Sequence, residues 1–109
     1  MKQKLASLSM PYVEKTSLAE SVTDADILYM TRVQKERCAT PEEYEAARKG
    51  ALLTGDIADS MREKAIIMHP LPRVDEIDPV VDRSVHAKYF EQTNNGVPVR
   101  MALLKTLLT

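Results

Sequence analysis

The sequence has one cysteine, three glycines and no tryptophan in 109 residues. With Cys38 alone, a disulfide within the chain is excluded, and Cys38, His69 and His86 lack the spacing of zinc ligands. Three scattered glycines exclude a P-loop and a GxGxxG dinucleotide motif. These absences exclude a disulfide-rich scaffold and glycine-rich phosphate loops of these two kinds, and the single cysteine favours a reducing, cytoplasmic compartment.

The chain also lacks an excess of either charge and any long hydrophobic run. It carries 15 basic and 16 acidic residues, which argues against a nucleic-acid partner because such binders show a basic excess. No apolar run approaches the roughly 20 residues that span a bilayer, and no secretory signal is visible. We therefore expect a single globular domain with no membrane partner, whose core is mainly aliphatic because aromatic residues make up only 5%.

The pattern along the chain is that of alternating short strands and helices. Two continuous apolar runs predict strands that are buried on both faces, as in a parallel sheet. Capping boxes that start at Ser17 and Thr40 predict two helices, the second ending before a C-cap glycine at Gly50. The predicted strands are 27–30 and 65–68, with weaker candidates at 10–14 and 52–54. The predicted helices are 2–9, 17–22, 40–49, 56–61 (capped by Asp56), 87–93 and, after a break at 94–96, 98–108.

This order favours an α/β fold with a parallel sheet flanked by helices. In such sheets, ligands bind beyond the carboxyl ends of the strands. The loops 31–39 and 69–73 follow the two strongest strands. The sequence therefore predicts that both loops lie at the ligand-binding edge.

Arg32 and Gln34 suit a carboxylate ligand. In extended backbone, residues two apart point to the same side, so a guanidinium and a carboxamide would lie together. Arginine binds both carboxylate oxygens, and glutamine adds a donor. The alternative is a solvated charged loop that makes only surface salt bridges.

The segment 69–73, His-Pro-Leu-Pro-Arg, suits an amine or amide ligand. Prolines have no N–H, so a rigid Pro-x-Pro turn leaves carbonyls free to face a ligand, and a cis X–Pro bond would aim one of them. The alternative is a loop that only terminates a strand. His69 itself is more typical of a packed, hydrogen-bonded residue than of a catalyst.

Several motifs together resemble aspartate carbamoyltransferase. They are Asp26–Arg37 (DILYMTRVQKER), Met68–Ile77 (MHPLPRVDEI), Tyr89–Gln92 (YFEQ), Asn95-Gly96 and Val99–Leu104 (VRMALL), in the order and with the gaps of the second half of that family. The HPLPR segment distinguishes the chain from ornithine carbamoyltransferases, whose loop resembles HCLP.

The resemblance implies transfer of the carbamoyl group of carbamoyl phosphate to the amino group of L-aspartate, in pyrimidine (UMP) biosynthesis. It implies a Rossmann-like parallel sheet, homotrimers, and no metal or organic cofactor. Residues 1–109 would form part of the aspartate-binding domain, an incomplete second domain without the carbamoyl phosphate domain.

The resemblance also implies roles for single residues. Arg32 matches the arginine that holds an aspartate carboxylate, and Gln34 a neighbouring substrate-side amide. Pro70 and Leu71 match residues whose carbonyls contact the carbamoyl NH2 and the aspartate amine, and Leu71–Pro72 matches a cis peptide. Arg37 resembles an arginine that bridges to the other domain when the cleft closes.

Other family motifs do not occur in these residues. The Ser-Thr-Arg-Thr-Arg loop for carbamoyl phosphate, the His-Pro-Thr-Gln segment and the second carboxylate-binding arginine are missing. No complete catalytic set is therefore predicted, and we expect the 109 residues alone to be inactive. Two alternatives remain at this point: a non-catalytic amino-acid-binding or docking module, and a related transferase for another amino acid.

Overall fold

A computed structural model describes residues 2–108, so residues 1 and 109 of the predicted domain lie outside the described residues. The elements follow the predicted alternation of helices and strands. In order they are α1 (Lys2–Ser7), α2 (Leu18–Val22), β1 (Ile27–Tyr29), η1 (Lys35–Arg37), α3 (Pro41–Gly50), α4 (Gly55–Asp59), β2 (Ile66–Met68), η2 (Pro79–Arg83) and α5 (Tyr89–Leu108).

The two predicted main strands form a parallel pair. Ile27 of β1 is in register with Ile66 of β2, and Tyr29 with Met68. The expectation that both strands are buried on both faces is wrong for β1, because Ile27 and Tyr29 are more than half exposed. Within residues 2–108, β1 pairs with β2 alone, so one edge and part of its surface lack a covering element.

The capping boxes begin helices as predicted. The Ser17 hydroxyl accepts a hydrogen bond from the Glu20 backbone N–H, and Thr40 does the same for Glu43. Each bond satisfies a backbone donor at a helix start. The predicted C-cap glycine is wrong, because Gly50 is the last residue of α3 and Ala51 is the C-cap. Gly50 does not adopt a left-handed conformation.

Three other predictions are wrong: a strand, a helix cap and a helix break. No strand forms at 10–14, where all five residues are exposed and Pro11 offers no N–H for pairing. Thr54, not Asp56, caps α4, because its extended backbone lets its hydroxyl accept from Ile57. The predicted break at 94–96 is absent, and α5 runs through Pro98 with the loss of one backbone hydrogen bond.

The candidate strand at 52–54 is reduced to one parallel bridge, between Leu53 and Ile77. The Leu53 N–H donates to the Glu76 carbonyl at 2.9 Å, and the Asp78 N–H donates to the Leu53 carbonyl at 2.9 Å. This bridge brings the segment after β2 against the residues that precede α4.

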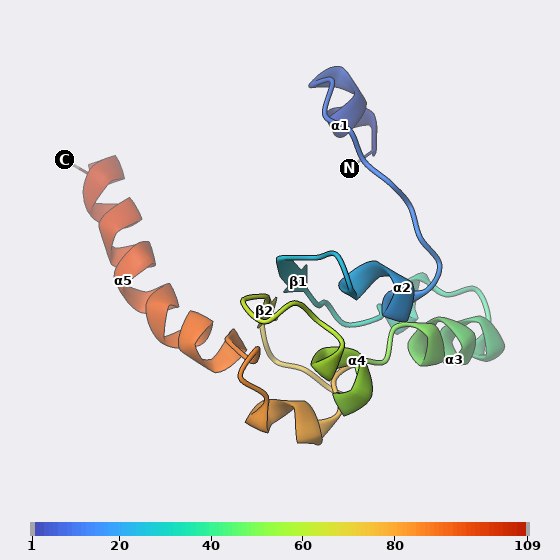
Figure 1. The fold of residues 1–109 in the computed structure, drawn as a ribbon. Helices are drawn as coiled ribbons and strands as arrows, with labels where there is room; N and C mark the ends of the chain where they lie inside the picture. Colours follow the sequence, from blue (N-terminus) through green and yellow to red (C-terminus); the bar gives the residue numbers. More distant parts are fainter. Residues whose placement is uncertain (1, 109) are drawn as a thin grey trace.

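A small, mainly aliphatic core holds these elements together. Its residues are Val22, Met30, Leu53, Ala58, Met61, Ala65, Ile67, Ile77, Val81 and Tyr89. Both α1 and the distal part of α5 extend away from this body (Figure 1). The radius of gyration is therefore 16.3 Å, against about 13 Å for a compact domain of this size. Among residues 2–108, none of the helices is long and apolar enough to cross a membrane.

Candidate functional site

An open cleft lies where the two strands end. Because β1 and β2 are parallel, the loops that follow them share one edge of the sheet, as predicted. The cleft has a volume of about 870 Å³. It is lined by Thr31, Arg32, Val33, Gln34, Arg37, Cys38, His69, Pro70, Leu71, Pro72 and Val74. All five residues singled out in the sequence, Arg32, Gln34, Arg37, Pro70 and Leu71, therefore lie around one cavity.

One wall of the cleft carries the cationic and amide groups. Residues 31–34 form no regular element, Gln34 is extended, and both Arg32 and Gln34 line the cleft. The Arg32 guanidinium pairs with Glu36 at 3.1 Å, and both side chains are more than half exposed. An exposed pair of this kind contributes little to stability, so a ligand carboxylate can replace Glu36 at small cost.

The other wall is the loop after β2. Pro70 is exposed, and Leu71 adopts a φ of 48°, in the left-handed region that leucine rarely occupies. The Leu71–Pro72 peptide is cis, as the resemblance implied. Among residues 2–108, no donor forms a hydrogen bond with the carbonyls of Pro70 and Leu71. Both carbonyls are thus available to a ligand.

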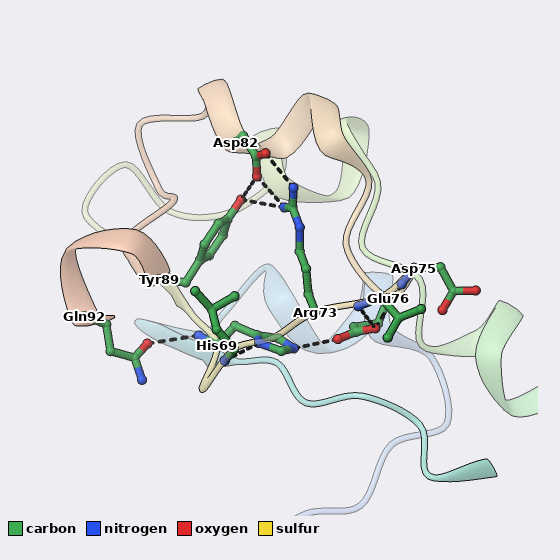
Figure 2. A network of polar contacts seen from close by, with 9 residues as sticks. His69, Arg73, Asp75, Glu76, Asp82, Tyr89 and Gln92 are labelled. Carbon is green, nitrogen blue, oxygen red and sulfur yellow. Dashed lines mark hydrogen bonds and ion pairs between the residues drawn. The ribbon is translucent and has the colours of Figure 1, made fainter. Parts of the chain in front are cut away.

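Behind this wall lies a buried polar network. His69 Nε2 and Glu76 Oε1 are 2.7 Å apart, with side chains 1% and 3% exposed. Burial opposes ionisation of Glu76, but hydrogen bonds from the backbone and from His69 outweigh it, so the pKa of Glu76 is lowered. Gln92 of α5 accepts from the His69 N–H at 3.0 Å (Figure 2). His69 is thus the packed, hydrogen-bonded residue that the sequence favoured.

Glu76 is expected to make the protein sensitive to acid. Because its pKa is lower in the folded than in the unfolded chain, its contribution to the free energy of unfolding is complete above the unfolded value, near 4.5. That contribution declines as pH falls below 4.5 and is lost below the folded pKa. Urea unfolding between pH 7 and pH 3 measures this loss. Glu76→Gln should give a flatter profile, and an unchanged profile would contradict the assignment.

A second network anchors the end of the loop. Arg73 binds Asp82 through both terminal nitrogens, and the Tyr89 hydroxyl donates to the same carboxylate (Figure 2). The hydrogen bonds from Arg73 lower the pKa of Asp82, and its burial opposes this only in part. Burial, followed by the bond to Asp82, raises the pKa of Tyr89 to about 12. The network fixes the loop against η2 and the start of α5.

The sequence did not indicate these supporting residues. Glu76 and Asp82 lie seven and nine positions from their partners in a polar loop, where spacing carries no signal. Glu76 and Gln92 appeared only as members of the family motifs Met68–Ile77 and Tyr89–Gln92, with no role assigned to either. No group of three or more His, Cys, Asp or Glu residues within 2–108 is placed to hold a metal ion.

Comparison with known proteins decides the family. Residues 2–107 match the family described as "Aspartate/ornithine carbamoyltransferase, Asp/Orn binding domain". The chain belongs to the aspartate/ornithine carbamoyltransferase family. Among curated relatives, the aspartate carbamoyltransferase catalytic subunit of Methanoculleus marisnigri is 43% identical over 105 residues, 96% of this chain and 35% of the relative.

Solved carbamoyltransferase structures share the fold. The catalytic subunit of M. jannaschii aspartate transcarbamoylase gives a TM-score of 0.84 at 46% identity, covering 97% of this chain and 34% of that one. Trypanosoma cruzi aspartate transcarbamoylase, in complex with carbamoyl phosphate and aspartate, gives 0.79 at 33% identity, covering 94% and 32%. The chain thus spans about a third of the length of these relatives.

Proposed function

We propose that residues 1–109 form part of the aspartate-binding domain of an aspartate carbamoyltransferase. In this proposal the protein transfers the carbamoyl group of carbamoyl phosphate to the amino group of L-aspartate, in pyrimidine biosynthesis. A homotrimeric assembly and a cytoplasmic location, both implied by the resemblance, are part of the proposal. The chain's membership of the family and the ligands named for the Trypanosoma cruzi structure support it.

The observation that carries the proposal is the composition of the cleft. Arg32 offers a guanidinium for a carboxylate, and Gln34 offers an amide beside it. Pro70 and Leu71, on the opposite wall, offer two carbonyls for the carbamoyl NH2 and the aspartate amine. An amino dicarboxylate has the groups that these two walls require.

The chemistry of the proposed reaction needs positioning more than covalent catalysis. The neutral amine of aspartate attacks the carbamoyl carbon, a C–N bond forms, the C–O bond to phosphate breaks, and the proton that the amine loses is taken up by the departing phosphate. Carbonyls that accept from the amine orient its lone pair toward the carbon, which lowers the entropic part of the barrier. Arg37, exposed on the cleft rim, is proposed to bridge to the carbamoyl phosphate domain on closure.

Replacement of Arg32 by alanine is expected to weaken L-aspartate binding at least tenfold. A hydrogen-bonded charge pair contributes about 1.5–3 kcal/mol, and each 1.4 kcal/mol is a factor of ten in affinity. The measurement is an NMR titration of the ¹⁵N-labelled chain with L-aspartate, at concentrations that reach the millimolar range.

Arg62→Ala is the matched control for this prediction. The Arg62 side chain is 51% exposed, against 54% for Arg32, and it also forms surface ion pairs, with Asp24 and Asp26. It does not line the cleft. Equal effects of the two substitutions on aspartate affinity would overturn the assignment of the cleft as the aspartate site.

A further inference from the structure

The buried pair His69–Glu76 lies directly behind the proposed amine-binding wall. Its Nε2 and Oε1 atoms are 2.7 Å apart, and both residues are almost completely excluded from solvent. The proposed reaction gives neither side chain a direct contact with aspartate. The hydrogen bonds of the pair link it to the backbone of the loop that carries Pro70 and Leu71.

Two hydrogen bonds fix the tautomer of His69. The Leu71 backbone N–H donates to Nδ1 at 2.9 Å, so Nδ1 must be an unprotonated acceptor. The single ring proton therefore lies on Nε2, from which it is donated to Glu76 Oε1. Glu76 keeps its other oxygen for the Val74 and Asp75 N–H groups, each at 3.1 Å (Figure 2).

The bond to Leu71 sets the direction of a carbonyl. Pro70 and Pro72 have no N–H, so the Leu71 N–H is the one backbone donor between residues 70 and 72. The carbonyl of Pro70 belongs to the same planar peptide unit as that N–H, and the two point in opposite directions when the peptide is trans. An N–H held on the buried imidazole therefore turns the Pro70 carbonyl away from His69.

The same bond holds Leu71 in its unusual backbone conformation. Its φ of 48° belongs to a region that leucine enters only when its surroundings enforce it. The Leu71 N–H is anchored on His69, and His69 is itself anchored by Gln92 on one side and Glu76 on the other. The carbonyl of Leu71 is thus presented from a fixed backbone.

We propose that His69 and Glu76 are positioning residues that aim the carbonyls of Pro70 and Leu71 at the N–H groups of the substrates, the aspartate amine among them. Glu76 orients the imidazole and keeps its proton on Nε2, and Nδ1 holds the Leu71 N–H. This inference rests on the proposed function of the cleft. It assigns the pair to recognition of the amine and not of the carboxylates.

The test compares L-aspartate with succinate, a dicarboxylate without the amine. His69→Asn can place its Oδ1 near the position of Nδ1, where it can still accept from the Leu71 N–H. His69→Gln can place its amide N–H near the position of Nε2, where it can still donate to Glu76, but it has no acceptor near the position of Nδ1. We expect His69→Gln to weaken aspartate binding about tenfold and to leave succinate binding unchanged within about twofold. His69→Asn should retain the wild-type preference within about threefold. Glu76→Gln, whose one carbonyl oxygen cannot serve both His69 and the backbone, should resemble His69→Gln.

Long-range ¹H–¹⁵N spectra of the wild-type chain provide a readout that needs no variant. They should show the Nε2–H tautomer of His69 and slow hydrogen exchange of the Leu71 amide. An Nδ1–H tautomer, an unaffected aspartate affinity in His69→Gln, or an equal loss of both ligands would overturn the inference while leaving the aspartate site intact. Failure of the wild-type chain to bind either ligand would instead overturn the proposed function.

Discussion

The purified 109-residue chain is expected to release no phosphate from carbamoyl phosphate and L-aspartate. None of its segments offers the family's Ser-Thr-Arg-Thr-Arg phosphate loop or its His-Pro-Thr-Gln segment. Loss of one oxyanion donor alone costs about 10²–10³ in rate in a well-studied enzyme, so loss of the whole set places turnover below detection. In the proposed function, the groups of the cleft that bind aspartate are Arg32 and Gln34 on one wall and a loop carbonyl on the other.

A steady-state assay of carbamoyl aspartate formation measures this directly. The M. jannaschii catalytic subunit, a solved relative, serves as the positive control. Turnover that rises in proportion to the concentration of the chain, and that disappears in Arg32→Ala, would contradict the expectation. Such a result would mean that phosphate and oxyanion binding are performed by residues that carry no family motif.

Tyr89→Ala is expected to remove a large part of the stability of the chain. Tyr89 is completely buried, its ring packs edge-on against Phe90, and its hydroxyl binds Asp82. Deleting a large buried aromatic side chain costs about 3–5 kcal/mol, against a total of about 5–15 kcal/mol for a typical domain. In urea this corresponds to a fall of about 2 M in the unfolding midpoint.

Tyr89→Phe separates the hydroxyl from the ring. We expect a loss of about 1 kcal/mol, because Asp82 keeps its bonds to Arg73. The pKa of Tyr89 is raised from 10.0 to about 12, so its contribution to stability is complete below pH 10 and is lost as pH rises toward 12. The Phe variant should lack this alkaline loss. Equal destabilisation by Ala and Phe would contradict the packing role of the ring.

The sequence predicted what local chemistry determines. Ser17 and Thr40 start helices because their hydroxyls can cap only nearby backbone groups, and the apolar runs at 27–30 and 65–68 produced the paired strands. Once those strands are parallel, Arg32 and Leu71 must follow them at one edge of the sheet. The candidate cleft was therefore within reach of sequence reasoning.

Features that depend on packing between distant segments could not be predicted from the sequence. Pro98 was expected to start a helix, yet α5 passes through it with the loss of a single hydrogen bond. Exposure of Ile27 and Tyr29 depends on what covers β1, which no local pattern specifies. Glu76 contacts His69 where the loop folds back on itself, and the bridge between Leu53 and Ile77 holds the adjoining backbone, which no local pattern specifies.

One measurement tests the central claim most directly: an NMR titration of the wild-type chain with L-aspartate, with L-asparagine as the comparison ligand. The account predicts saturable shifts of the backbone amides of Arg32, Gln34 and Leu71, and weaker shifts with asparagine, which lacks the side-chain carboxylate. Amides of α4, which has no residue in the cleft, should not move. An absence of shifts, or shifts confined to residues outside the cleft, would contradict the account.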